Sequence, residues 1–98
     1  MEIIKKLEGN QLTIQLVGEL NTVTAPEFDK VIKDDIKGVS TLILDFAKLD
    51  YLSSAGLRVL LLAQKTMNQQ GNMIVRNVNS QILDIFEMTG FTSILTIE

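Results

Sequence analysis

The sequence predicts an α/β domain in which helices cover a mixed β-sheet. Segments with the period-two or continuous apolar pattern of strands alternate with segments whose apolar residues follow helical spacing. Strands that alternate with helices pair in parallel through right-handed crossovers, and an N-terminal hairpin adds an antiparallel edge. The predicted order is β-β-α-β-α-β-α, followed by a last strand. At 98 residues the chain has the size of one domain, spanning residues 1–98.

The chain is predicted to begin with a β-hairpin. Residues 2–7 are rich in residues that favour strands, and residues 8–10, Glu-Gly-Asn, supply turn chemistry. Residues 11–18 then alternate polar and apolar, which is typical of a half-buried strand. Gly18 is expected to close this second strand.

A first helix is predicted to follow, opening at Thr24-Ala25-Pro26-Glu27. Thr24 can cap it, Glu27 lies three residues further on, and Pro26 is tolerated in a first turn because its missing N–H needs no partner there. Lys37-Gly38 is the expected stop. Its apolar stripe consists of Phe28, Val31, Ile32 and Ile36.

The next strand and helix surround the segment of greatest interest. Residues 41–46 form a short apolar run, predicted to be a strand buried on both faces. A connector from Asp45 to Ser54 then leads to a Leu-rich helix over residues 57–70, which ends at Gly71.

The last third of the chain contains two strands and a helix. Residues 72–76 form a short strand, and Asn79 or Ser80 caps a third helix that ends before Gly90. Residues 93–97 are expected to form the final strand.

Composition excludes several classes of function. The net charge of -3 and the scattered basic residues argue against nucleic-acid binding. The chain has no cysteine and no histidine, so disulfides, the usual zinc ligands and Ser-His catalysis are excluded, and no cofactor is expected. No apolar run approaches the roughly 20 residues that span a bilayer, and no signal-peptide core is present, so we expect a cytoplasmic protein without membrane insertion.

Two serines lie where a predicted strand gives way to a helix. In open α/β sheets, functional loops lie at the carboxyl ends of the parallel strands. Ser53 and Ser54 would therefore stand at a helix N-terminus, where unpaired N–H groups and the helix dipole favour an anion such as a phosphate. Taken alone, the pattern favours a serine that only caps the helix, because serine is a preferred capping residue.

Several segments together resemble the STAS domain, and more narrowly the stand-alone bacterial anti-anti-sigma factors. The segments are Gly18-Glu19-Leu20-Asn21, Thr24-Ala25, Leu42 to Asp45, Leu49 to Leu57, and Ile85 to Phe91. The resemblance covers essentially the whole chain, including the order of its elements.

The resemblance implies a regulatory binding protein rather than an enzyme. The unphosphorylated form would bind an anti-sigma factor that is also a serine kinase, and so free the sigma factor. The kinase would phosphorylate the serine two residues before the motif glycine, here Ser54, and a phosphatase would reset the protein. The partner-binding positions that the resemblance implies, or that we infer from the residues themselves, are Asn21, Thr22, Ser53, Ser54, Ala55, Gly56, Leu57 and Arg58.

Two positions depart from the pattern of the family. Asn21 and Ser53 stand where the family commonly has aspartate, and both changes remove negative charge near the site. Ser53 is therefore a rival phosphorylation site, and the choice of Ser54 rests on its register with Gly56.

Two other functions compete with this interpretation. STAS domains also serve as subunits of membrane transporter complexes, including lipid-transport ABC systems, in which the serine need not be phosphorylated. A small enzyme that uses Ser53 or Ser54 as a nucleophile is disfavoured, because no histidine is available as its base.

Overall fold

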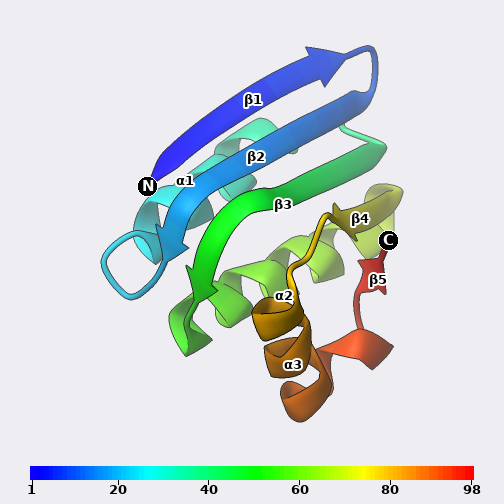
Figure 1. The fold of residues 1–98 in the computed structure, drawn as a ribbon. Helices are drawn as coiled ribbons and strands as arrows, with labels where there is room; N and C mark the ends of the chain where they lie inside the picture. The colour runs from blue at the N-terminus through cyan, green and yellow to red at the C-terminus, as the bar shows by residue number, and fades with distance from the viewer.

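Five strands form one sheet in the order β1-β2-β3-β4-β5, and three helices connect them (Figure 1). The structure is a computed structural model and describes residues 1–98. The elements are β1 (Glu2–Glu8), β2 (Gln11–Leu20), α1 (Ala25–Asp35), β3 (Thr41–Leu52), α2 (Ser54–Gln70), β4 (Asn72–Arg76), α3 (Ser80–Thr89), the 3-10 helix η1 (Phe91–Ser93) and β5 (Thr96–Ile97).

The strand pairing confirms the predicted mixed sheet. β1 and β2 are antiparallel and form the N-terminal hairpin, whereas β2, β3, β4 and β5 pair in parallel. The antiparallel strand β1 lies at one edge and the short β5 at the other (Figure 1). The fold class and the order of elements are those predicted from the sequence.

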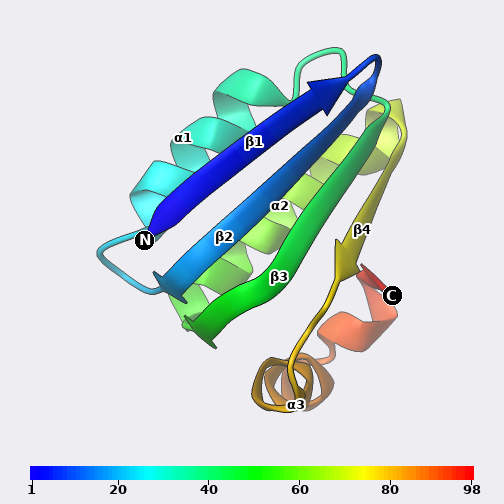
Figure 2. The ribbon, with the colours of Figure 1, turned by 45° about the horizontal axis from the view of Figure 1, so that its top comes forward.

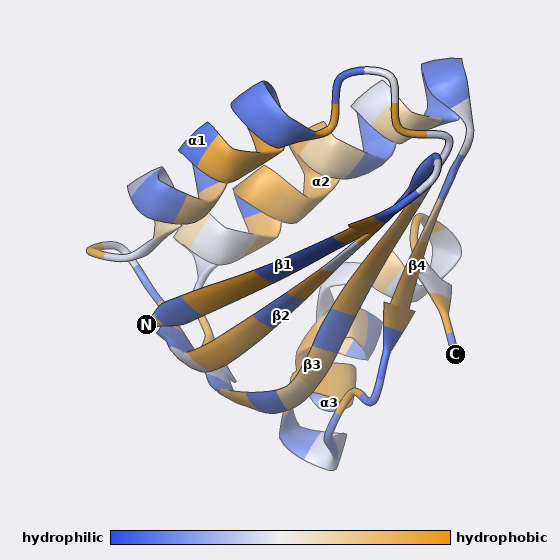
Figure 3. Cartoon of the chain, turned by 90° about the horizontal axis from the view of Figure 1, so that it is seen from above, coloured by the Kyte–Doolittle hydropathy of each residue, from blue (hydrophilic) through white to orange (hydrophobic).

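Helices α1 and α2 cover one face of the sheet (Figures 2 and 3). The alternation along β2 turns Leu12, Ile14 and Leu16 into the core, where the α1 residues Phe28 and Ile32 are also buried. Figure 3 shows this alternation as bands of polar and apolar colour along the strands. In β3 the consecutive residues 42–44 are all buried, so this part of the strand is covered on both faces, as predicted.

The third helix lies beyond the carboxyl end of β4, beside the second half of β3 (Figure 2). Asn79 caps it, as expected, because its side chain accepts a hydrogen bond from the Ile82 N–H at 2.9 Å. The same side chain donates to the Leu49 carbonyl of β3 at 3.0 Å. Asn79 thus fixes both the start of α3 and its place against the sheet. Gly90 ends the helix with a φ of 80°.

Two predicted strand boundaries were wrong. β2 does not end at Gly18 but continues to Leu20, and β3 continues to Leu52 where a connector from Asp45 to Ser54 was expected. The register between the two strands shifts between Gln15 and Val17 and again between Gly18 and Glu19. These irregularities let β2 and β3 bend together and keep pairing through a stretch whose sequence looks like a loop.

Three further boundaries also differ from the prediction. α2 begins at Ser54 rather than Leu57, because the Leu57 N–H donates to the Ser53 carbonyl at 3.0 Å and closes a first turn. The last strand is only Thr96–Ile97, because η1 occupies the residues before it. α1 ends at Asp35, ahead of Gly38.

Candidate functional site

The two serines lie beside the loop that joins β2 to α1. The Ser53 N–H donates to the Leu20 carbonyl at 2.9 Å, so the end of β2 is tied to the start of α2. Because β2 and β3 are neighbouring parallel strands, their carboxyl ends meet at the same edge. Asn21 and Thr22 are thereby brought to the same end of the sheet as Ser53 and Ser54.

A local hydrogen-bond network fixes the β2–α1 loop. The Asn21 side chain accepts from the Val23 and Thr24 N–H groups at 2.9 and 3.1 Å. The Thr24 hydroxyl accepts from the Asn21 N–H and donates to the Glu19 carbonyl, both at 2.8 Å. Thr24 occupies the cap position of α1, but its side chain braces the loop rather than capping the helix. Thr22 and Val23 are held outward at the tip.

The two serines have different environments. Ser54 is the first residue of α2 and is exposed. Ser53 precedes it in an extended conformation, and its hydroxyl oxygen is buried and has no hydrogen-bond partner. Neither serine side chain caps the helix, so the structure gives no support to a purely capping role. Of the two, Ser54 is the residue that a protein partner can reach.

Gly56 and Leu57 face the core rather than the surface. A Cβ atom placed on Gly56 would lie 2.7 Å from side-chain atoms of both Leu20 and Leu52. Leu57 retains only 8% of its surface exposure. Both residues seat the first turn of α2 on the ends of β2 and β3.

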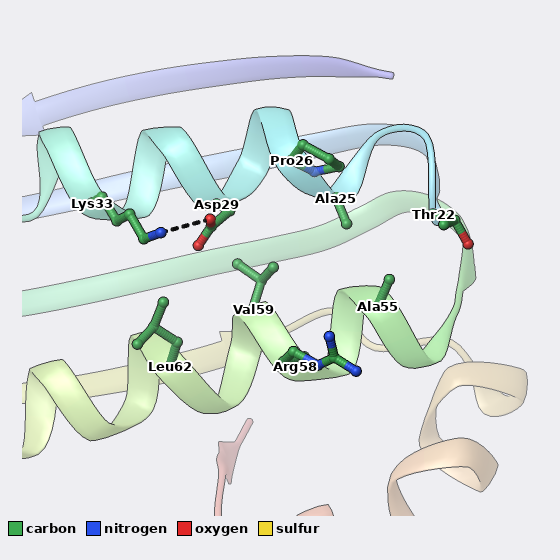
Figure 4. Close-up of a pocket in the computed structure, with 9 residues that line it drawn as sticks. All are labelled: Thr22, Ala25, Pro26, Asp29, Lys33, Ala55, Arg58, Val59 and Leu62. Atoms are coloured by element: carbon green, nitrogen blue, oxygen red, sulfur yellow. Dashed lines mark ion pairs between the residues drawn. The ribbon is translucent and has the colours of Figure 1, made fainter.

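Ala55 and Arg58 lie on the side of α2 that faces α1. They line a cavity of about 480 Å³ together with Thr22, and its other walls include Asp29 and Lys33 of α1 (Figure 4). Asp29 and Lys33 form an ion pair with each other at 3.0 Å. The cavity therefore begins at the serine site and continues between the two helices.

Two exposed apolar residues near the site escaped the sequence analysis. Val23 is 85% exposed at the tip of the β2–α1 loop, and Tyr51 is 48% exposed near the end of β3. Each is an apolar residue in a segment that was expected to be a loop. The spacing of apolar residues alone does not show whether such a residue is buried in the core or exposed to a partner. Both increase the apolar area that this end of the molecule presents.

The site has no features of a metal centre. No group of three or more His, Cys, Asp or Glu side chains lies close enough to hold a metal ion. The Asp45 carboxylate accepts hydrogen bonds from the Ala47 N–H and the Asn77 side chain, both at 3.0 Å. It has a structural role in the sheet.

The sequence model of the STAS domain matches residues 2–98. The chain belongs to the STAS domain family. Among curated relatives, this STAS protein is 35% identical over 94 residues to the proposed anti-sigma factor antagonist BtrV of Bordetella bronchiseptica, covering 94% of this chain and 80% of that one.

Solved structures agree with the family in fold. An anti-sigma factor antagonist from Mycobacterium paratuberculosis superposes with a TM-score of 0.89 at 18% identity, covering 98% of this STAS protein and 83% of that chain. The Bacillus cell fate determinant SpoIIAA in its phosphorylated form has a TM-score of 0.78 at 20% identity, covering 99% and 91%. The resemblance drawn from the sequence motifs is thus confirmed at the level of family and fold.

The relatives of this STAS protein are named as regulators rather than enzymes. This agrees with the regulatory, non-enzymatic class that the motifs implied. None of the helices combines the length and the apolar character that a membrane span requires.

Proposed function

We propose that this STAS protein is an anti-sigma factor antagonist controlled by phosphorylation of Ser54. In the unphosphorylated state it binds a cytoplasmic anti-sigma factor that is also a serine kinase, and the sigma factor is released. The kinase transfers the γ-phosphoryl group of ATP to the Ser54 oxygen, which loses its proton, and ADP leaves. The phosphorylated protein dissociates, and a phosphatase restores the hydroxyl.

The observation that carries the proposal is the exposure of Ser54 at the first residue of α2, within the family motif. A kinase must reach the hydroxyl, and Ser54 is accessible, whereas the Ser53 oxygen is buried. The relatives named as anti-sigma factor antagonists support the class of partner. One structural relative is known in a phosphorylated form, which supports the modification.

A local change of charge is sufficient for the switch. Phosphorylation adds about -1.5 to -2 charges at neutral pH. In a close-packed interface this charge loses its hydration against apolar partner groups and is repelled by acidic ones. A coupling of roughly 1–3 kcal/mol changes affinity about 5- to 150-fold. The buried Gly56 and Leu57 hold the first turn in place, so the charge change requires no refolding.

Binding of Ser54 variants to the partner tests the proposal. The partner is the serine-kinase anti-sigma factor of the source organism, purified and titrated with the STAS protein in a calorimeter or by competition with the sigma factor. Ser54→Ala should bind like the parent protein. Ser54→Asp should bind at least about fivefold more weakly, at the lower end of the expected coupling.

Ser53→Asp is less informative than Ser53→Ala as a control, because a carboxylate at the buried position would also disturb folding. Ser53→Ala removes only the unpartnered hydroxyl, so it should bind normally and still accept one phosphate from the kinase, and mass spectrometry should locate that phosphate on Ser54. Equal affinity of Ser54→Ala and Ser54→Asp, or phosphate found on Ser53 of the parent protein, would refute the assignment.

The transporter alternative predicts a different set of results. As a subunit of a lipid-transport complex, the protein would co-purify with an ATPase subunit rather than with an anti-sigma factor. Ser54→Asp and Ser54→Ala would then both support assembly and transport. Those outcomes would replace the proposal.

A further inference from the structure

Helix α2 is the one helix of the protein with a positive net charge. It carries Arg58 and Lys65 and no acidic residue, which gives it +2 in a chain whose net charge is -3. α1 has four acidic and two basic residues, and α3 has two acidic and no basic residues, so each has a net charge of -2. The helix that presents Ser54 therefore differs in sign from the rest of the molecule.

Arg58 lies one turn after Ser54, on the same side of α2. Residues four apart on a helix are neighbours, with about 5–6 Å between their Cβ atoms. The side chain extends toward the N-terminal turn of the helix, next to Ala55 (Figure 4), which is the usual direction of long side chains in helices. Its guanidinium group points toward the end of α2 that carries the Ser54 hydroxyl.

Arg58 has no ion-pair partner within the protein. It takes part in none of the four salt bridges, and its side chain makes no hydrogen bond. The carboxylate that shares its cavity, Asp29, is already paired with Lys33 at 3.0 Å (Figure 4). An exposed and unpaired guanidinium beside the serine is free to bind a new anion.

We infer that Arg58 is the residue through which phosphorylation of Ser54 acts. Its guanidinium group pairs with the phosphate within α2, and it is then no longer available for contact with the partner. This inference rests on the proposed phosphorylation of Ser54. In the unphosphorylated state Arg58 is exposed and unpaired, and it contributes a positive charge to the binding surface. A phosphoserine in position 54 engages it, since guanidinium and phosphate form short, strong and often bidentate hydrogen bonds.

The pairing cancels the positive charge at the N-terminal turn of α2. About two negative charges on the phosphate more than offset the single positive charge of Arg58, whereas Lys65 lies too far along the helix to take part. The phosphate thereby has two effects: it adds an anion to the surface, and it withdraws a cation that would contact an acidic group of the partner. Against an acidic partner surface, both effects would reduce the electrostatic complementarity of the interface.

A ³¹P NMR titration of the phosphorylated chain tests the pairing without any partner. The protein is made with phosphoserine at position 54, as the parent chain, as Arg58→Gln and as Lys65→Gln. Arg58 should lower the second pKa of the phosphate, so that this pKa is higher in Arg58→Gln than in the parent. Lys65 is eleven residues from Ser54, about 16 Å along the axis, which exceeds the screening length of roughly 8–10 Å. Lys65→Gln should therefore match the parent.

Binding to the anti-sigma partner then tests the consequence. The ratio of affinities between the unphosphorylated and phosphorylated forms should fall by at least ~3-fold in Arg58→Gln, and stay unchanged in Lys65→Gln. Equal phosphate pKa values in the parent and Arg58→Gln would overturn the inference and leave the proposed switch intact. Equal binding of Ser54→Ala and Ser54→Asp would instead remove the proposed function, whatever the NMR result.

Discussion

Replacement of Gly56 by alanine is expected to destabilise the protein, although alanine is the better helix former. The added Cβ would lie 2.7 Å from Leu20 Cγ and from Leu52 Cδ1, so both leucines must move. Overpacking of a core typically costs about 1–3 kcal/mol, and the gain in helix propensity offsets up to about 1 kcal/mol. Two contacts as short as 2.7 Å place the overpacking cost in the upper half of that range, so the net loss is about 1–2 kcal/mol, which for a domain of this size lowers Tm by roughly 5–15 °C.

Thermal and urea unfolding of Gly56→Ala measure this loss. Leu20→Ala provides the matching test, because it removes the two Leu20 atoms that the new methyl group meets and leaves only the contact with Leu52. In the double variant the two losses should be clearly less than additive, since the cavity left by Leu20 accepts the methyl group. A Gly56→Ala protein as stable as the parent, or additive losses in the double variant, would show that Gly56 is not required for the close contact of α2 with β2 and β3.

Two further substitutions test other contacts of the fold. Gly71→Ala should destabilise by about 3 kcal/mol or more, because its Cβ would overlap the backbone carbonyl of Ser40, and urea unfolding of a variant with near-parent stability would contradict that contact. Asn79→Ala should lose about 1–2 kcal/mol of unfolding free energy in the same assay, because it removes both the cap of α3 and the hydrogen bond to β3. Ser80→Ala removes neither contact and should change stability little. Equal losses in the two variants would contradict the capping role.

The arrangement of elements could be predicted from the sequence because each element carries its own pattern. The alternation in residues 11–17 and the helical spacing after Pro26 are local signals, and they identified β2 and α1 without tertiary information. The C-terminal half of β3 carries a weaker signal. Residues 47–51 alternate apolar and polar over only five positions, and of these only Leu49 is buried. This half of the strand pairs with β2 through two register shifts, which the sequence does not reveal.

The site was predictable in its location but not in the orientation of its side chains. Sequence register placed Ser53 and Ser54 at the start of α2, and this placement is correct within one residue. The sequence did not distinguish an exposed Ser54 from a Ser53 with a buried hydroxyl, since this difference depends on how the end of β2 packs against the junction. For the same reason, Gly56 and Leu57 looked like contact residues although they face inward.

A fixed base under Ser54 would make the proposed charge-based switch effective. The loop beside it is braced by the Asn21 and Thr24 side chains, and the first turn of α2 rests on Leu20 and Leu52 through Gly56. If this turn could rearrange, a phosphate would move away from the partner at small energetic cost, and the interface would adapt. Because Gly56 seats this turn on Leu20 and Leu52, a phosphate added to Ser54 as proposed would remain in the contact surface, and its free energy would appear in the affinity rather than in a change of shape.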